Sequence, residues 1–344
     1  MSSHRNVGRA EAPYLRKPVP ARHRLGVLHV PLVRVVVRRL VMAVPLLFIV
    51  SALTFVLMSL MPGDAARRVL GPQATPETVE RLRQQLGLDL PIQEQYWQWL
   101  TKALKGDLGA STVTGQPVAQ AIAERAPVSV SLIVGALLVS LLVGVGIGVF
   151  SAVRGGFAGR FVDGLALAGF ALPSFWVGAI LILVFAVALG WFPASGYVSW
   201  SDSPQLWLAS LVLPVIALSL SVVAAIAKQT RDAMMDALGS EYVRMARANG
   251  VSRVSLVMRH TLKNAATRIS TVVGLQAVAL LGGTVLAESV FALPGLGGLV
   301  VSAAFQQDLP TVQGIVVLFT IIVVLINLVV DVTYAWLNPK VRVQ

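Results

Sequence analysis

Long runs of apolar residues without a charged side chain constrain this chain more than any other feature. Six such runs recur along its 344 residues. A helix needs about 20 consecutive apolar residues to cross a bilayer, and in lipid it must satisfy all of its own backbone hydrogen bonds. Charged residues make up 13% of the chain, against roughly 25% in a soluble domain. The sequence therefore predicts an all-α integral membrane protein with six transmembrane helices.

The ends of the apolar runs set the boundaries of the predicted spans. The first span occupies residues 34–61, behind a cluster of arginines. The other five lie at residues 128–153, 163–189, 206–227, 269–287 and 309–336. Small residues let helices approach closely in lipid. We therefore expect the second span to pack closely through its glycines, which are Gly135, Gly144, Gly146 and Gly148.

Three segments lie around these spans. Residues 1–33 are basic and rich in proline, and we interpret them as a disordered cytoplasmic tail. Residues 62–125 are hydrophilic, and we expect an extracytoplasmic region with short helices; one begins at Thr75-Pro76-Glu77 and ends at Gly87. Residues 126–336 hold the remaining five spans and a hydrophilic stretch at residues 228–268.

The distribution of charge predicts the orientation. If the six spans alternate, 21 of the 28 lysines and arginines fall on one face of the membrane, together with both termini and residues 228–268. The other seven lie in the region after the first span, where seven acids balance them. Basic residues concentrate in cytoplasmic loops, so we expect both termini in the cytoplasm. This bias also accounts for the net charge of +12 without a nucleic-acid partner.

The motifs that the sequence lacks narrow the function. It has no cysteine and four histidines, all outside the predicted spans. Zinc-binding His-Glu-x-x-His, nucleophile-elbow and phosphate-loop motifs are absent. We therefore expect no catalytic residue, no cofactor and no metal site. An ion-driven transporter normally holds ionisable groups near the membrane midplane, whereas here Asp163, Glu288 and Asp331 lie at or near span ends. If this protein moves a solute uphill, a partner must supply the energy.

The stretch at residues 228–268 is too patterned to be a plain connector. Ser240 is placed to cap a first short helix, which Gly250 ends, and Ser252 to cap a second. One face of the first helix holds Tyr242, Met245, Ala246 and Asn249. The apolar residues of the second repeat at helical spacing, at Val254, Val257, Met258 and Leu262. The pattern fits a docking surface for another protein, or a basic helix pair resting on anionic lipid.

Residues 241–265 resemble the cytoplasmic loop of binding-protein-dependent ABC importer permeases, in the form typical of the dipeptide, oligopeptide and nickel branch. Ala246, Gly250 and Leu262 match the spacing of the family motif. The positions of its acid, isoleucine and proline hold Arg244, His260 and Lys263, as is typical of the peptide branch. Short matching stretches follow in the family's order, at residues 61–64, 86–91, 106–111, 172–175, 192–197, 288–297 and 308–310.

This resemblance implies a type I ABC importer permease fold with a long external region after the first span. Its implied partners are a second homologous permease, two cytoplasmic ABC ATPase subunits or domains, an extracytoplasmic solute-binding protein and membrane lipid. The implied location is the plasma or inner membrane of a prokaryote. The resemblance also implies that residues 228–268 form a coupling loop that contacts the ATPase. The implied contact residues are Glu241, Tyr242, Arg244, Met245, Ala246, Arg247, Ala248, Gly250 and Leu262.

The expected function is that of a non-catalytic permease subunit of an ATP-driven importer for di- and oligopeptides. One alternative is the same fold importing nickel, glutathione or another small solute, because in this family the binding protein does most of the selecting. More distant alternatives are an ion-coupled secondary transporter and an intramembrane enzyme. The sequence identifies neither the solute nor the residues that line its path.

Overall fold

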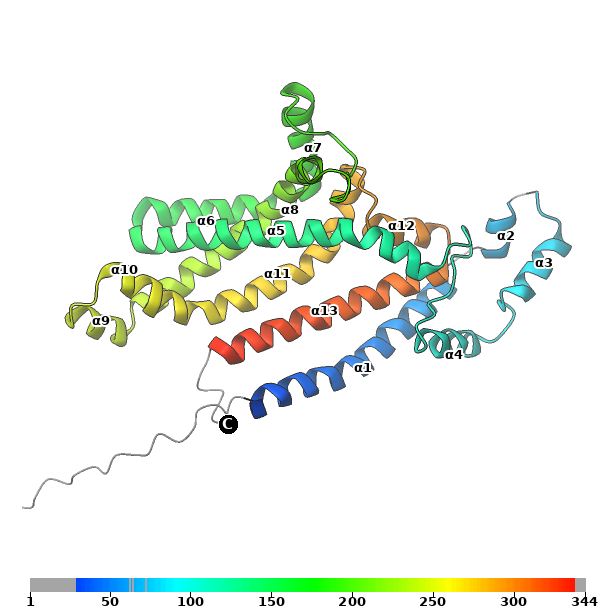
Figure 1. Cartoon of the computed structure of the whole chain (residues 1–344), viewed down its shortest axis with the longest axis horizontal. Coiled ribbons are helices and arrows are strands. Elements are labelled where there is room, and N and C mark those ends of the chain that lie inside the picture. Colours follow the sequence, from blue (N-terminus) through cyan, green and yellow to red (C-terminus); the bar gives the residue numbers. More distant parts are fainter. Residues whose placement is uncertain (1–28, 62, 64, 72, 338–344) are drawn as a thin grey trace, which may run out of the picture.

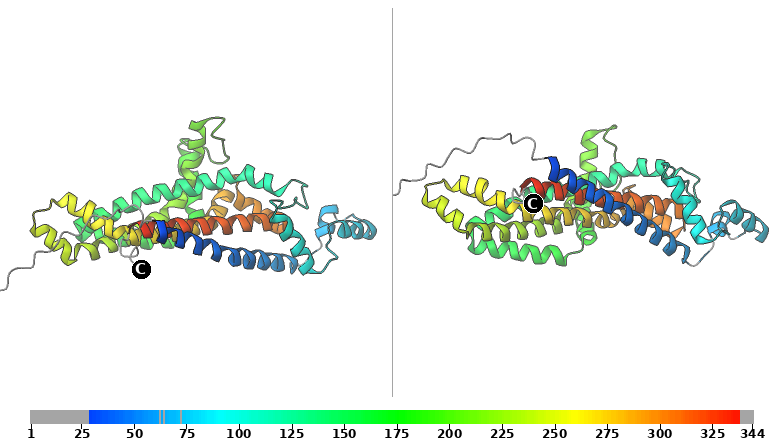
Figure 2. Two further views of the ribbon diagram at one scale, coloured as in Figure 1. Left: turned by 60° about the horizontal axis from the view of Figure 1, so that its bottom comes forward. Right: turned by 90° about the horizontal axis from the view of Figure 1, so that it is seen from below.

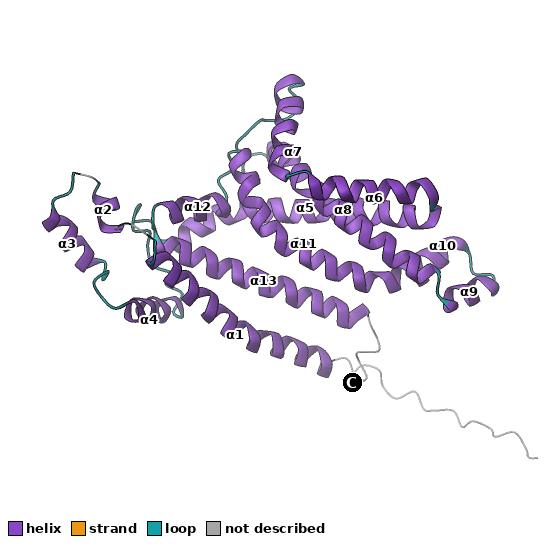
Figure 3. Ribbon diagram, turned by 180° about the vertical axis from the view of Figure 1, so that it is seen from behind, coloured by secondary structure: helices purple, strands orange, loops and turns teal. Residues whose placement is uncertain are grey.

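The computed structural model of the protein describes residues 29–61, 63, 65–71 and 73–337. Among these residues helices dominate, and the only strand-like pairing is an isolated bridge between Ala110 and Pro117. The all-helical prediction is confirmed (Figures 1 and 3). Residues 29–33 of the predicted tail already belong to the first helix. The rest of that tail, and the carboxyl-terminal residues 338–344, lie outside the described residues.

Five helices of the described chain are long and apolar enough to cross a membrane. They are α1 (His29–Ser59), α5 (Val118–Arg154), α8 (Pro204–Leu238), α11 (Leu262–Val290) and α13 (Leu309–Leu337). They run roughly along the long axis of the molecule (Figure 1). The shorter helices are α2 (Ala65–Leu70), α3 (Pro76–Gln85), α4 (Ile92–Ala103), α6 (Gly156–Ala171), α7 (Ser174–Leu181), α9 (Glu241–Ala248), α10 (Arg253–Ser255) and α12 (Leu296–Phe305). Two π-helices, η1 (Ile182–Ala188) and η2 (Leu256–Thr261), complete the set.

The third predicted span is broken. α6 ends at Ala171, and Leu172 adopts an extended conformation with φ −90° and ψ 117°. Pro173 explains the break, because a proline disfavours helical dihedrals in the residue before it and has no N–H to donate. α7 and η1 then run at a steep angle to α6 (Figures 1 and 2), and α7 packs against α8 and α11. The prediction of one continuous helix over residues 163–189 is therefore wrong, although the chain is helical on both sides of the break.

The second predicted span begins earlier than expected. α5 starts at Val118, ten residues before the predicted boundary, and includes Pro127. Its 37 residues correspond to roughly 55 Å at the α-helical rise, more than a bilayer core requires. The hydrophilic region before it holds α2, α3 and α4 at one end of the molecule (Figure 1). α3 begins as predicted, with the Thr75 side chain accepting the Thr78 N–H at 3.4 Å.

α8 is the central helix, and α5, α6, α7 and α11 all pack against it. The contact with α5 is close because three of its glycines face α8. A Cβ added to Gly148 would lie 2.6 Å from the Ala227 carbonyl oxygen, and one added to Gly144 would lie 2.9 Å from Ile226. Gly135 similarly meets Val215. Close packing through these glycines is confirmed, whereas Gly146 meets no atom within 4 Å.

A buried carboxylate fixes α12 to the bundle. Glu288, near the end of α11, is 1% exposed. It accepts hydrogen bonds from the Ser129 hydroxyl at 2.6 Å and from the Gly298 N–H at 2.9 Å. The Leu296 N–H in turn donates to the Ser129 oxygen at 2.9 Å. Buried charge is costly unless it is hydrogen-bonded, so these contacts hold α5, α11 and α12 in one arrangement.

Candidate functional site

The hydrophilic stretch at residues 228–268 forms the tip of a long helical hairpin. α8 continues past its apolar part to Leu238, and residues 253–290 form one helical run through α10, η2 and α11. Only residues 239–240 and 249–252 are not helical, and α9 lies between them. We call residues 239–261 the hairpin tip. It lies at the opposite end of the molecule from α2 and α3 (Figures 1 and 3).

Two contacts fix how α9 sits on the hairpin. Val243 is fully buried where α9 packs against η2 and α8. The Tyr242 hydroxyl accepts a hydrogen bond of 2.7 Å from the Asn264 side chain of α11. The sequence patterns did not predict this role of Val243. Its signal was available, since it is the only β-branched aliphatic residue of α9.

The ends of the tip helices agree with the sequence in part. Gly250 has φ +76°, the left-handed conformation expected after a helix end. The Ser252 side chain accepts the Ser255 N–H at 3.4 Å, so its predicted cap is confirmed. Ser240 is the N-cap residue of α9, as predicted, but its side chain makes no capping hydrogen bond. Its hydroxyl donates back to the Ala237 carbonyl instead.

The second helix of the tip is a π-helix over part of its length. The wider turn changes which side chains face the protein. Val257 and Leu256 are buried, whereas Val254 and Met258 are exposed. The sequence placed Val254, Val257 and Met258 on one apolar face, and this is wrong because it assumed a regular α-helical period. The π-turn thus turns apolar side chains outward.

The outer surface of the tip combines apolar and basic side chains. Val254 is 74% exposed, Met245 68% and Met258 54%. Exposed cations accompany them, namely Arg244, Arg247, Arg253 and Arg259, and exposed Lys263 follows at the start of α11. Large exposed apolar side chains with a polar rim mark interaction sites. This surface can therefore receive a partner that presents apolar pockets and acidic groups.

The structure brings eight of the nine predicted contact residues together on α9 and its end. Ala246 is half-buried, and the exposed ones are Glu241, Tyr242, Arg244, Met245, Arg247, Ala248 and Gly250. Leu262 lies elsewhere. It is half-buried and packs against a cluster that includes Met234 of α8 and Ile269 of α11. Leu262 therefore helps to hold α8 and α11 together just below the hairpin tip.

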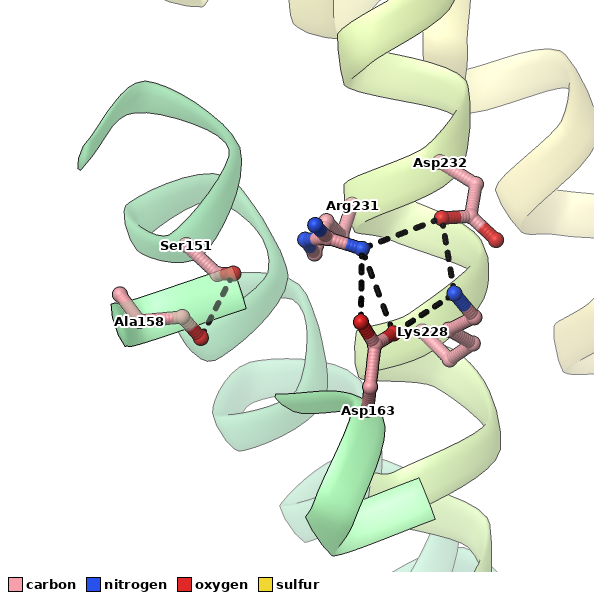
Figure 4. A network of polar contacts seen from close by, with 6 residues as sticks. All are labelled: Ser151, Ala158, Asp163, Lys228, Arg231 and Asp232. Carbon is pink, nitrogen blue, oxygen red and sulfur yellow. Dashed lines mark hydrogen bonds and ion pairs between the residues drawn. The ribbon is translucent and has the colours of Figure 1, made fainter. Parts of the chain in front are cut away.

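A charged network joins this hairpin to α6 (Figure 4). Asp163 of α6 accepts a 2.7 Å hydrogen bond from Lys228 Nζ and a 3.3 Å one from Arg231 Nη1. Asp232 lies 3.2 Å from Lys228 Nζ and 3.6 Å from Arg231 Nη1. Closer to the tip, Arg268 of α11 pairs with Asp236 of α8. These ion pairs connect the two arms of the hairpin with each other and with α6.

Comparison with known proteins shows that the chain is similar to transport proteins. Residues 144–343 match the family described as binding-protein-dependent transport system inner membrane component, and residues 32–133 match its amino-terminal companion. A proposed peptide transport system permease protein of Brucella abortus (strain 2308) is 44% identical over 308 residues, which cover 89% of this chain and 98% of that protein. Over the same length, the glutathione transport system permease protein GsiC of Escherichia coli (strain K12) is 40% identical.

The likeness extends to a solved fold. The inward-facing MetNI methionine ABC transporter contains a chain that superposes with a TM-score of 0.50 at 15% sequence identity. The match covers 64% of this chain and 97% of that one. At this identity the match concerns the fold alone, and it is the fold that the sequence resemblance implied.

Proposed function

The chain belongs to the family of binding-protein-dependent transport system inner membrane components, and on that premise we propose that it is the permease subunit of an ATP-driven importer for di- and oligopeptides. The observation that carries this proposal is the exposed apolar and basic surface of the hairpin tip, held on two long apolar helices. A permease of this kind needs a contact through which work done elsewhere reaches its membrane helices.

In this proposal the tip docks on a cytoplasmic ABC ATPase. Met245 and Met258 enter apolar pockets of the ATPase, and Arg247 pairs with one of its acids. α9 cannot move independently of the hairpin, because Val243 is buried against it and Tyr242 is hydrogen-bonded to α11. Closure of two ATPases around ATP then shifts α8 and α11 together, which favours one of two states of the permease.

The remaining partners follow from the same proposal. A second homologous permease completes the path, and a solute-binding protein delivers the solute from outside. This subunit hydrolyses no ATP. It lies in the plasma or inner membrane of a prokaryote with both termini in the cytoplasm. Short peptides are the proposed solute because the similar Brucella protein is named for peptide transport. Glutathione is the second candidate, since the similar Escherichia coli protein is named for it.

Uptake by the reconstituted transporter tests the class and the solute. The chain, its partner permease and the ATPases are placed in vesicles with ATP at the ATPase side and the binding protein outside. We expect ATP-dependent uptake of a labelled dipeptide or of glutathione, and none of labelled nickel. Uptake driven by a proton or sodium gradient without ATP would contradict the proposal and would indicate an ion-coupled transporter.

A glycine pair tests the docking surface. Gly250→Asp adds a side chain where φ is +76° and a negative charge within the basic surface, so it should abolish uptake and lower co-purification of the ATPase. Gly239→Asp is the matched control, because Gly239 lies in the same tip with φ −76°. It should keep most of the uptake. Normal ATPase co-purification and uptake in Gly250→Asp would exclude this surface as the coupling contact.

A further inference from the structure

An open apolar groove runs between α5 and α6. It encloses about 450 Å³ and is lined by residues of both helices, among them Gly146, Phe150, Phe157 and Phe161. Phe157 is 81% exposed, and Phe150 and Phe161 are each 56% exposed. Gly146 forms part of the wall, where an added Cβ would meet nothing within 4 Å. This glycine leaves space on the face away from α8, unlike Gly144 and Gly148.

Two arginine side chains lie near one end of the groove. Arg154 lies one turn beyond Phe150 on the same face of α5, and its guanidinium carbon is 5.3 Å from the centroid of the Phe150 ring. Arg154 and Arg160 are both exposed, and neither forms an ion pair with an acid in the described part of the chain. The first turn of α6 starts here without an acid, so its dipole adds to the positive potential.

The walls of the groove are held in place. The Ser151 hydroxyl of α5 donates a 3.0 Å hydrogen bond to the Ala158 carbonyl of α6, which fixes the turn between the two helices (Figure 4). At the same turn, Arg253 of the hairpin tip donates to the Val153 carbonyl at 3.5 Å. The groove is therefore preformed, and its charged end lies next to the tip.

We propose that this groove binds one anionic phospholipid of the leaflet on the side of the hairpin tip. An acyl chain lies against Phe150, Phe157 and Phe161, over the space left by Gly146. The phosphate lies at Arg154, with Arg160 nearby. The apolar walls suit a hydrocarbon chain, and unpaired arginines at the groove end suit a negative headgroup. With the proposed orientation this is the cytoplasmic leaflet, but the site itself does not depend on the solute or on ATP.

Lipid retention by the purified transporter tests this site. The complex is equilibrated with vesicles of equal parts phosphatidylglycerol and phosphatidylcholine, re-purified in mild detergent, and its bound lipid is counted by mass spectrometry. The native chain should retain phosphatidylglycerol in excess. Arg154→Gln should lower that excess about fivefold, the effect of one basic residue at an anionic surface. Gly146→Leu should fill the groove and remove the retained lipid.

Two control variants separate the groove from general effects. Arg67→Gln removes an exposed arginine from α2, and Gly282→Leu fills open space beside α11. Both should retain lipid as the native chain does. The proposal is overturned if the native chain retains the two lipids equally, or if Arg154→Gln and Gly146→Leu retain as much phosphatidylglycerol as the controls. Crosslinking of a Phe157→Cys variant to another protein subunit in the membrane would likewise overturn it, because a polypeptide would then fill the groove.

Discussion

Single side chains in this protein join segments that come from different helices. Glu288 is the clearest case, since its carboxylate joins Ser129 of α5 to the Gly298 N–H of α12. Its position at a span end was visible in the sequence, but its partners lie 159 and 10 residues away. A buried carboxylate held in this way tolerates little crowding. The glycines around it therefore differ in how much an added side chain would cost.

The pair Gly295 and Gly298 gives a residue-scale prediction. A Cβ at Gly295 would lie 2.1 Å from the Glu288 carboxyl carbon, whereas one at Gly298 would lie 4.0 Å from the nearest carboxylate oxygen. Gly295→Ala should displace the carboxylate and lower stability by roughly 1–3 kcal/mol, as overpacking does. Gly298→Ala should be close to neutral. Thermal unfolding in detergent compares them, and equal melting temperatures would show that the carboxylate can move without cost.

Among the helices, α9 depends on its neighbours for its position. It has eight residues, too few for an isolated helix to be stable in water. Its fixed position comes from Val243 below and from Tyr242 at its side. This attachment matters for the proposed function, because a docking helix that could swing freely would transmit no force to α8 and α11.

Valine substitutions test this attachment. Val243→Ala removes two buried carbons, and at about 0.8 kcal/mol for each carbon it should cost roughly 1.5 kcal/mol of local stability. Hydrogen exchange of the amides at residues 241–248 should therefore accelerate about tenfold, through easier local opening. Val254→Ala makes the same chemical change on a side chain that is 74% exposed, and exchange should be unchanged. Equal exchange in both variants would mean that α9 is held by other contacts.

For the whole molecule, the long helices separate two polar ends. α2, α3 and α4 lie at one end and the hairpin tip at the other (Figure 1). The charge bias of the sequence predicts that the tip lies in the cytoplasm. Because the chain contains no cysteine, single cysteines can report the side of each end without a background signal.

Labelling of single cysteines in intact cells tests the orientation. Ala246→Cys in α9 should stay unlabelled by a membrane-impermeant maleimide until the cells are opened. Gln85→Cys, on the exposed end of α3, should be labelled from outside. The two sites serve as controls for each other. The reverse pattern would place the tip outside and remove its proposed contact with an ATPase.

The sequence by itself determined the all-helical membrane class, the family and the ends of several helices. These follow from local causes, such as uncharged runs long enough to cross a bilayer and a glycine at a left-handed helix end. The same local rules placed the Gly250 helix end and the Ser252 cap correctly. At Ser240 they placed the N-cap residue but not its hydrogen bond, because the hydroxyl found a partner in the preceding turn instead.

Only the tertiary structure decided how these helices are used. Packing set α7 against α8 and α11 after the break at Pro173, buried Val243, and left Val254 and Met258 exposed before and within the π-helix η2. The packing also left Gly146 facing open space, whereas Gly144 and Gly148 face α8. The physical reason is the same in each case. Apolar periodicity shows which side chains avoid water, but in a membrane protein both the lipid and the protein interior satisfy that preference, so only contacts between distant segments choose between them.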